Sequence, residues 1–457
     1  MSGTRIESVS GIRGIVGDGF DPIVAAGFTA AYASTLAPGP IVVGHDGRIS
    51  ADLFSRAVLS AVVASGRDAL WAGAVATPTL GVLVRDHAAS GGIQISASHN
   101  PPRYNGLKFF QPKGMVLSPT MGKAVIDAFH QRSPDWAKWD ELGSIHTIDD
   151  PDRDHLNTIL AKVDVTAIQS RRFRVLVDAC HGAGGRPAAS LLRALGCECE
   201  ILGANPDGLY DHPPEPTEDN LRGFAAGVVA RGAAIGFAQD PDADRLAIVD
   251  ETGRYIGEEL TLALVAARRL DQDLGPFVVN LSTSRVVEDL AKSKGLVTHR
   301  TPVGEIHVVE RMIAERAMLG GEGNGGVIDP RIGYVRDGFI AMALVLDLMA
   351  ARREPISKIV DSLPRYYMIK EKYDLTSINE SNEGAAERFE RLAELFPDAR
   401  IDRRDGIRLA WDDRWVQARA SNTEPIARVI AEARDRETAA ALARRVGAAL
   451  TANGGSR

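Results

Sequence analysis

Residues 92–101 read Gly-Ile-Gln-Ile-Ser-Ala-Ser-His-Asn-Pro, and they give the first indication of how this chain folds. The short apolar segment at residues 92–95 is typical of a buried β-strand. Asn-Pro at the end of the stretch is typical of a turn, because proline cannot continue a strand and asparagine bonds to its own backbone. The stretch therefore predicts that Ser98 lies at the exit of a strand.

The same order of elements recurs on both sides of this stretch. Short strands rich in Val and Ile run into glycine-containing turns and then amphipathic helices around residues 39–65, 172–195 and 276–319. This alternation is typical of α/β domains. The third segment predicts a helix over residues 306–319. A turn is expected over residues 320–326, where five of seven residues are glycine and the backbone must bend sharply or approach a ligand.

The pattern changes after residue 355. Apolar segments on both sides of the polar turn Asp412-Asp413 predict an antiparallel hairpin. Together with helices it would form a small α+β domain at the C-terminal end. The expected strands cover residues 406–411 and 414–418, and the expected helices cover residues 383–395 and 436–450.

The composition narrows the class of protein. With 457 residues the chain is longer than one hydrophobic core usually supports, so several domains are expected. A net charge of −7 and the lack of a dense basic run argue against nucleic acid as a partner. The N-terminus resembles no signal peptide, and the most apolar window, residues 338–351, is short and contains Asp347. We therefore expect a cytoplasmic protein without a membrane partner.

Ser98 permits three interpretations. A serine before Asn-Pro often only caps a turn. A Ser-His hydrolase is disfavoured, because neighbouring residues of an extended strand point to opposite sides, which would turn His99 away from Ser98. A phosphoserine needs only hydrogen-bond donors and a metal around it. Lys108 is near in sequence, and it is either a solvated surface lysine or an acid/base group whose pKa a pocket lowers.

The stretch Asp-Pro-Asp-Ala-Asp-Arg at residues 240–245 is a candidate metal site. Carboxylates at every second residue lie on one side of an extended backbone, where they suit a hard cation. An EF-hand is disfavoured, since the sixth position of its loop requires glycine and here holds Arg245. Mg²⁺ typically combines one or two carboxylates with phosphate oxygens, so a phosphate on Ser98 would complete its shell. Arg245 is then expected to contact the phosphoryl group.

Two further turns carry polar groups suited to a sugar phosphate. Glu322 and Asn324 stand in the glycine-rich turn, where they can bind sugar hydroxyls, although a plain flexible loop is the alternative. Residues 419–425, Arg-Ala-Ser-Asn-Thr-Glu-Pro, combine an arginine with hydroxyls, an amide and backbone N–H groups, which is the chemistry of a phosphate nest. Arg428 adds a second guanidinium.

Taken together, these four motifs resemble the α-D-phosphohexomutase superfamily in their order and spacing. The resemblance spans the chain and includes residues 8–14, Ser-Val-Ser-Gly-Ile-Arg-Gly, where Arg13 matches the family's active-site arginine. It implies three mixed α/β domains and a C-terminal α+β phosphate-binding domain around a central cleft. The domains so implied are a phosphoserine domain (1–150), a metal domain (151–252), a sugar domain (253–364) and a phosphate domain (365–457).

The resemblance also implies a set of site residues. Those implied in catalysis are Ser98 as the phosphoserine, His99, Lys108, Arg13 and Arg245. Those implied in binding are Ser98, Asp240, Asp242 and Asp244 for Mg²⁺, Gly304, His307, Glu322 and Asn324 for the sugar, and Arg419, Ser421, Asn422, Thr423 and Arg428 for the distal phosphate. Phospho-Ser98 would phosphorylate a hexose monophosphate, and the resulting 1,6-bisphosphate would return its other phosphate to Ser98. A hexose 1,6-bisphosphate is the implied activator.

The sequence departs from the family pattern at the sugar site. Many members have Ser and His where this chain has Asn324 and Gly326, and His307 is a candidate to compensate, although a solvated histidine at a helix start fits equally well. The motifs are most similar to the archaeal type of phosphoglucosamine mutase, with phosphomannomutase/phosphoglucomutase next. A Mg²⁺-dependent phosphatase would not need the distal nest, and a sugar-phosphate-binding pseudoenzyme would be expected to have lost Ser98 or an aspartate. The sequence is compatible with either a monomer or a homodimer.

Overall fold

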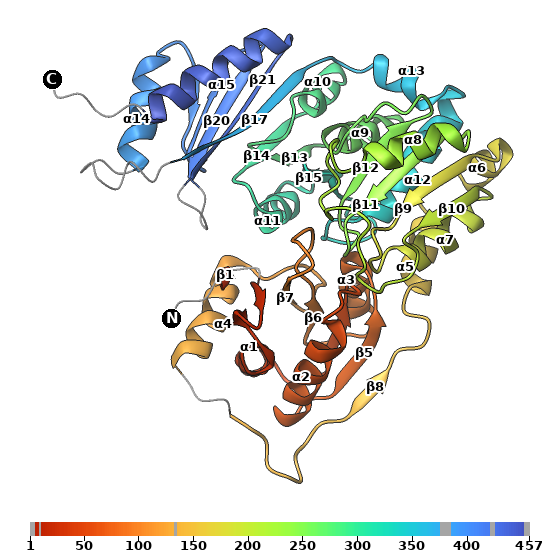
Figure 1. The fold of residues 1–457 in the computed structure, drawn as a ribbon, viewed down its shortest axis with the longest axis vertical. Helices are drawn as coiled ribbons and strands as arrows, with labels where there is room; N and C mark the ends of the chain where they lie inside the picture. The colour runs from red at the N-terminus through yellow and green to blue at the C-terminus, as the bar shows by residue number, and fades with distance from the viewer. Residues whose placement is uncertain (1–4, 9–10, 132–134, 375–384, 421–425, 452–457) are drawn as a thin grey trace.

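The computed structural model describes residues 5–8, 11–131, 135–374, 385–420 and 426–451. Within these residues the chain forms four sheets that follow one another along the sequence, each with its own helices (Figure 1). The first three sheets mix parallel and antiparallel strands, and the last is antiparallel throughout. The predicted fold class, three mixed α/β domains and a C-terminal α+β domain, is confirmed. The exact boundaries at residues 150, 252 and 364 stay a prediction.

The N-terminal sheet has strands of both directions. Its strands are β1 (Ile6–Ser8), β2 (Gly11–Val16), β3 (Gly19–Phe20), β4 (Ile41–His45), β5 (Ala69–Ala74), β6 (Gly91–Ile95), β7 (Tyr104–Phe110) and β8 (Ile145–Thr147), in the order β1-β2-β7-β6-β4-β5-β8 with β3 beside β2. Its helices are α1 (Pro22–Thr35), α2 (Ala51–Ala64), α3 (Thr77–Asp86) and α4 (Pro119–Gln131). Strands β4, β5, β6 and β8 run parallel, while β7, β2 and β1 continue the sheet antiparallel.

The second and third sheets are built alike. The second has the order β10-β9-β11-β12, with β9 (Arg174–Asp178), β10 (Glu198–Leu202), β11 (Ile235–Gln239) and β12 (Leu246–Asp250). The third has the order β14-β13-β15-β16, with β13 (Phe277–Asn280), β14 (Thr298–Thr301), β15 (Leu319–Glu322) and β16 (Gly326–Ile328). Their helices are α5 (Arg153–Leu160), α6 (Val165–Arg171), α7 (Gly185–Ala194), α8 (Arg222–Ala230), α9 (Glu259–Gln272), α10 (Val286–Ser293), α11 (Glu305–Glu315), α12 (Gly338–Arg352) and α13 (Ile356–Asp361).

The C-terminal sheet confirms the hairpin expected around residues 412–413. Its strands are β17 (Tyr367–Asp374), β18 (Arg400–Asp402), β19 (Ile407–Ala410), β20 (Trp415–Ala420) and β21 (Ile426–Ala433), in the order β17-β21-β20-β19-β18. Its helices are α14 (Ala385–Leu395) and α15 (Arg436–Thr451). Leu442 and Val446 on α15 pack into the same apolar cluster as Val416 and Val429 of the sheet, which gives this domain its own core.

Each of the three α/β units ends its parallel run with a strand that turns back into an antiparallel partner. These pairs are β6 with β7, β11 with β12, and β15 with β16. The turn in the first pair carries Ser98, the second carries residues 240–245, and the third follows Glu322. The three candidate loops therefore occupy the equivalent position in three similarly built sheets.

The segment before the third turn differs from the expectation. The predicted helix over residues 306–319 ends earlier, at Glu315, because Arg316 adopts a left-handed backbone with φ 51° that terminates α11. Leu319 instead begins β15, and the glycine-rich stretch lies largely in β15 and β16 rather than in one long turn. Glu322 is consequently the last residue of a strand, which fixes its position better than a loop would.

The apolar window at residues 338–351 forms α12, whose residues from Gly338 to Ala350 are buried. Helix α12 packs against α9, α5 and α6. Because neighbouring elements surround it, the helix is hydrophobic on all sides. Asp347, the one charged residue of the window 338–351, pairs with Arg268 at 2.8 Å. Among the described residues, no helix is both long and apolar enough to span a membrane.

Candidate active site

Ser98 lies in a buried turn directly after β6. Its backbone is left-handed, with φ 49°, a conformation that costs a residue with a side chain about 1–2 kcal/mol. The Ser98 N–H donates to Ser96 Oγ at 2.8 Å, and Ser98 Oγ donates to Asp240 Oδ2 at 2.9 Å. The serine and the aspartate loop, 142 residues apart in sequence, are therefore in direct contact, as the sequence led us to expect.

The expectation that His99 points away from Ser98 is wrong. His99 Nδ1 lies 3.2 Å from Ser98 Oγ. The backbone at Ser98 is left-handed rather than extended, so neighbouring side chains do not alternate here and His99 can face the Ser98 hydroxyl. Arg245, together with burial and Arg13, holds the pKa of His99 well below its ordinary value. The imidazole is therefore neutral at neutral pH and can accept or donate a hydrogen bond at Ser98.

Arg48 holds the Ser98 turn in place, and the sequence analysis did not identify it. Its Nε pairs with Asp46 at 3.0 Å, and Asp46 accepts a hydrogen bond from Ser96 Oγ at 2.6 Å. Its two terminal nitrogens donate to the backbone carbonyls of Ser98, Asn100, Pro101 and Tyr104. The planar guanidinium thus ties both arms of the turn together. The only sequence signal was Asp-Gly-Arg after β4, a common type of turn.

We expect Arg48→Lys to lower kcat by roughly 10²-fold with the fold intact, because one ammonium cannot replace a fork that reaches four carbonyls, and small displacements of a reacting group are costly. Steady-state kinetics with a thermal melt tests this. Arg67→Lys is the matched control: Arg67 also donates to backbone carbonyls of this domain, those of Leu36 and Ala37, but not to the Ser98 turn. Equal losses of kcat in both variants would contradict a role for Arg48 in placing Ser98.

Asp240, Asp242 and Asp244 converge, although not by the extended backbone that was expected. Ala243 has φ 53° and its N–H donates to the Asp240 carbonyl at 2.9 Å, so the segment is a tight turn. One oxygen of each carboxylate lies within 4.8 Å of the others. Oδ1 of Asp242 and Oδ1 of Asp244 are buried without a hydrogen-bond partner in the described part of the chain. Three converging carboxylates with unpartnered oxygens fit a hard divalent cation.

The charges of the triad are shared unevenly. Burial and the neighbouring Asp242 and Asp244 raise the pKa of Asp240 well above its ordinary value. Burial acts in the same direction on Asp242, but the Lys108 ammonium and a hydrogen bond from Thr77 hold the pKa of Asp242 below its ordinary range. The repulsion among three buried carboxylates therefore falls mainly on Asp240, the one that contacts Ser98.

Lys108 reaches this triad from β7. Its Nζ lies 3.0 Å from Asp242 Oδ2 and 2.9 Å from Asp244 Oδ2. Burial alone would lower the pKa of Lys108, but the two carboxylates outweigh burial and raise it. The expectation that a pocket lowers the Lys108 pKa is therefore wrong for this structure. Lys108 is thus a charged partner of the triad in this structure.

Two further arginines border the triad. Arg245 donates its backbone N–H to Asp240 Oδ1 at 3.1 Å, and its Nε lies 3.9 Å from both Asp240 Oδ2 and Asp244 Oδ1. This Nε is buried without a hydrogen-bond partner among the described residues. Arg13 on β2 donates to Asn100 Oδ1 at 3.2 Å, beside the Ser98 turn. Both guanidiniums thus lie where an anion near Ser98 would meet them.

Glu322 is held at the end of β15 by donors from three segments. Asn280 Nδ2 and the Gly304 N–H donate to its Oε1 at 2.8 and 3.1 Å, and Arg336 donates to its Oε2 at 2.9 Å. Gly304, one of the predicted sugar residues, is thereby brought to Glu322. Asn324 Oδ1 accepts from the Gly326 N–H at 3.2 Å within the turn. His307 lies in the first turn of α11, where its N–H donates to the Gly304 carbonyl at 3.1 Å.

Arg336 is the second residue that the sequence analysis missed. It precedes α12 in an irregular segment, and its guanidinium donates to Asp244 Oδ2 at 2.6 Å and to Glu322 Oε2 at 2.9 Å. One side chain therefore joins the aspartate triad to the turn predicted to bind sugar. The sequence signal there, Arg-Asp-Gly before an apolar run, indicates a helix start at Asp337 and gives no hint of this role.

The C-terminal domain brings one predicted phosphate residue toward the third domain. Arg419, in β20, pairs with Asp405 Oδ2 at 3.2 Å. The same carboxylate oxygen accepts from the Val303 N–H at 3.1 Å, next to Gly304. Arg428 lies opposite Arg419 on β21 and is exposed. The other three predicted phosphate-binding residues lie outside the described residues: Ser421, Asn422 and Thr423.

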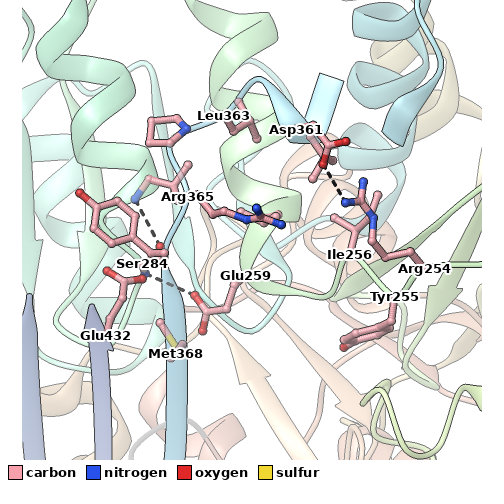
Figure 2. Close-up of a pocket in the computed structure, with 15 residues that line it drawn as sticks. Arg254, Tyr255, Ile256, Glu259, Ser284, Asp361, Leu363, Arg365, Met368 and Glu432 are labelled. Atoms are coloured by element: carbon pink, nitrogen blue, oxygen red, sulfur yellow. Dashed lines mark hydrogen bonds and ion pairs between the residues drawn. The ribbon is translucent and has the colours of Figure 1, made fainter. Parts of the chain in front are cut away.

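A cavity of ≈ 500 Å³ lies next to the glycine-rich turn that contains Glu322, between the third and fourth domains (Figure 2). Glu259 in its lining accepts the Ser284 N–H at 3.3 Å, and burial raises the pKa of Glu259 to about 7 despite its ion pair with Lys370. A Cβ on Gly323 would lie 2.1 Å from Glu259 Oε2. Glu259 therefore packs directly against the glycine-rich turn, and a side chain at 323 would force its carboxylate to move.

The geometry agrees with what comparison with known proteins finds. Domains I, II, III and the C-terminal domain described as phosphoglucomutase/phosphomannomutase match residues 5–135, 153–253, 258–367 and 375–449. The phosphoglucomutase/phosphomannomutase of Thermococcus kodakarensis is 37% identical over 436 residues, 94% of each chain. A protein of Methanopyrus kandleri named "Probable phosphoglucosamine mutase" is 35% identical over 94% of each chain.

Among solved structures, a phosphoglucomutase/phosphomannomutase family protein from Burkholderia thailandensis superposes with a TM-score of 0.84 at 25% identity. The superposition covers 98% of this chain and 99% of that one. The chain therefore belongs to the phosphoglucomutase/phosphomannomutase family, whose members are phosphohexomutases and hence isomerases.

Proposed function

We propose that this protein is a Mg²⁺-dependent phosphohexomutase that interconverts 6-phospho and 1-phospho hexoses through phospho-Ser98 and a bound 1,6-bisphosphate. The observation that carries the proposal is the contact of Ser98 Oγ with Asp240 Oδ2 at 2.9 Å, inside a group of three buried carboxylates. A serine that carries a phosphate and carboxylates that hold a cation are the two parts that phosphoryl transfer needs. Here two different domains supply them.

The aspartates 240, 242 and 244 would hold Mg²⁺ together with an oxygen on Ser98, and the unpartnered oxygens of Asp242 and Asp244 support this. When bound, Mg²⁺ supplies positive charge to the phosphoryl oxygens. Arg245 would donate to the same phosphoryl group, because its Nε lies 3.9 Å from Asp240 Oδ2 and has no hydrogen-bond partner in the described chain. Lys108 and Arg13 add positive charge around the transferred group.

In the transfer step a sugar hydroxyl oxygen forms a bond to phosphorus as the bond to Ser98 Oγ breaks. The sugar hydroxyl loses its proton and Ser98 Oγ gains one, so that Ser98 ends as a free hydroxyl and the sugar as a 1,6-bisphosphate. His99, neutral and 3.2 Å from Ser98 Oγ, is placed to hydrogen-bond the oxygen that leaves. The second half of the cycle is the same step in reverse, with the other phosphate returned to Ser98.

The phosphate that is not being transferred would bind in the C-terminal domain. The described residues include two members of this site, Arg419 and Arg428. Asp405 holds the Arg419 guanidinium facing the Val303-Gly304 turn beside Glu322. Ser421, Asn422, Thr423 and Arg428 are the proposed further donors. A hexose 1,6-bisphosphate would serve as activator, because Ser98 must be phosphorylated before the first turnover.

Glucosamine 6-phosphate is the substrate that we propose first, with glucosamine 1-phosphate as its product. The Gly-Glu-Gly-Asn-Gly-Gly form of residues 321–326 and the relatives named "Probable phosphoglucosamine mutase" support this choice. Phosphomannomutase/phosphoglucomutase activity is the second candidate, and the relative that is 37% identical favours it. Glu322, Asn324, Gly304 and His307 are the proposed sugar contacts, and the Glu322 carboxylate suits hydroxyls that several hexoses share.

A ³¹P NMR time course tests the proposed function. The protein, Mg²⁺ and a trace of hexose 1,6-bisphosphate are offered glucosamine, glucose and mannose 6-phosphates separately. Fastest conversion of the amino sugar into its 1-phosphate supports phosphoglucosamine mutase, and faster conversion of glucose or mannose moves the assignment to the second candidate. Inorganic phosphate as the only product would mean a phosphatase and would overturn the proposal.

A further inference from the structure

We propose that Arg336 is a positioning residue that fixes the sugar-binding carboxylate Glu322 relative to the metal-binding carboxylate Asp244. The inference rests on the proposed function, which assigns those two roles. It adds a residue that lies in none of the sequence motifs and that connects two sites from different domains.

The contacts of Arg336 are specific and buried. One terminal nitrogen donates to Asp244 Oδ2 at 2.6 Å and the other to Glu322 Oε2 at 2.9 Å. Its Nε lies 3.3 Å from Glu305 Oε2, and its backbone N–H donates to Glu305 Oε1 at 3.0 Å. Arg336 is 7% exposed, and all three carboxylates are buried with it. One guanidinium therefore hydrogen-bonds two carboxylates through its two terminal nitrogens and lies within ion-pair distance of a third, an arrangement that suits its planar fork.

Gly326 provides the space that Arg336 occupies. A Cβ built on Gly326 would lie 2.3 Å from Arg336 Cδ, closer than side chains approach, and 3.0 Å from Arg336 Cγ. The clash falls on the stem of a side chain whose head is held by carboxylates, so it cannot be relieved by a small rotation at the tip. The glycine at 326, which departs from the family pattern, is thus matched to the arginine at 336.

The arrangement explains how the two sites keep their spacing. Asp244 follows β11 in the second domain, whereas Glu322 ends β15 in the third. A phosphoryl group held at the triad and a sugar ring held at Glu322 belong to one substrate, so the distance between the two carboxylates must match it. Arg336 bonds to both and sets that distance.

Arg336→Lys keeps the charge but loses the fork. We expect it to raise both the KM for the hexose phosphate and the Mg²⁺ concentration for half-maximal activity by roughly 10- to 100-fold, the usual cost of losing a partner that orients ligating groups. Arg331→Lys is the matched control, since Arg331 lies five residues earlier and pairs with Asp329 at 2.6 Å, outside the site. Wild-type values of both constants in Arg336→Lys would overturn the proposal.

A double-mutant cycle separates positioning from a merely structural role. If Arg336 acts on the sugar through Glu322, Arg336→Lys will raise KM much less in a Glu322→Gln background than in the wild type, while its effect on the Mg²⁺ requirement persists. Fully additive effects on KM would contradict the proposal. A purely structural loss would lower the melting temperature and the active fraction and leave both constants unchanged.

Gly326→Ala provides a second variant that removes no charge. Gly326 has no positive φ, so alanine is compatible with its backbone, and the added Cβ should displace Arg336. The same paired rise in KM and Mg²⁺ requirement is expected. If Glu322→Gln alone leaves KM unchanged, or if the wild type needs no divalent cation, it is the proposed function that fails. The contact between Gly326 and Arg336 is tested separately by a crystal structure of Gly326→Ala. An undisplaced Arg336 in that structure would overturn the link between the two residues.

Discussion

Ser98→Ala is expected to abolish mutase activity, with a loss of at least roughly 10⁴-fold in kcat, because the variant has no oxygen to carry the phosphoryl group. The fold should survive, since the turn is held by Arg48 and by the Ser98 N–H to Ser96 hydrogen bond, neither of which needs the Ser98 hydroxyl. The left-handed backbone at φ 49° is no worse for alanine than for serine. The measurement is kcat for hexose phosphate conversion, with circular dichroism and a thermal melt as the check of folding.

Ser90→Ala is the control for this variant. Ser90 is also a buried serine of the first domain, but its hydroxyl bonds to the carbonyls of Gly39 and Pro40, away from the turn. Its kcat should stay near that of the wild type. Turnover by Ser98→Ala within a few-fold of the wild type, on a folded protein, would remove the phosphoserine from the mechanism.

Asp240→Asn has the second largest expected effect, and its two consequences point in opposite directions. Activity should fall by roughly 10³-fold, because the cation contributes several kcal/mol of transition-state stabilisation and loses a ligand next to Ser98. In EDTA, however, the variant should melt at a higher temperature than the wild type. The reason is that burial and the charges of Asp242 and Asp244 make an ionised Asp240 unfavourable.

The stability that Asp240 contributes in EDTA should fall as the pH rises. The raised pKa of Asp240 means that the folded protein binds a proton more tightly than the unfolded chain does. Its contribution to stability is complete below the ordinary aspartate pKa and is lost as the pH rises through the raised value. Melts in EDTA across pH should show this decline in the wild type and a smaller one in Asp240→Asn. Added Mg²⁺ should raise the melting temperature of the wild type alone; equal stabilisation of both proteins would contradict the assigned ligand.

The fold followed from local patterns that the sequence contains. Apolar strands, glycine turns and amphipathic helices predicted the α/β units, and the turn at Asp412-Asp413 predicted the C-terminal hairpin. The helix over residues 306–319 was extended too far, because Arg316 can end it with a left-handed cap that its residue type does not indicate. Periodicity alone could not place that boundary.

Sequence motifs indicated part of the candidate site, whereas contacts between distant segments, which the sequence does not reveal, form the rest. Ser98 and the three aspartates stood out by residue type and spacing, and the structure brings them together. Side chains do not alternate as in an extended strand in either loop, because Ser98 and Ala243 adopt left-handed conformations. Arg48 bonds to backbone carbonyls 50 to 56 residues away, and Arg336 bonds to Asp244, 92 residues away. Nothing in the local sequence distinguishes these two residues from surface arginines.

The phosphoserine mechanism is tested most directly by following one labelled phosphoryl group. Dephosphorylated protein is mixed with Mg²⁺ and hexose 1,6-bisphosphate carrying ³²P, the labelled peptide is mapped, and unlabelled glucosamine 6-phosphate is then added. We expect the label to appear on Ser98 and to pass from there into the hexose phosphate pool. Label that never resides on Ser98, or that passes from the protein only to water, would contradict it.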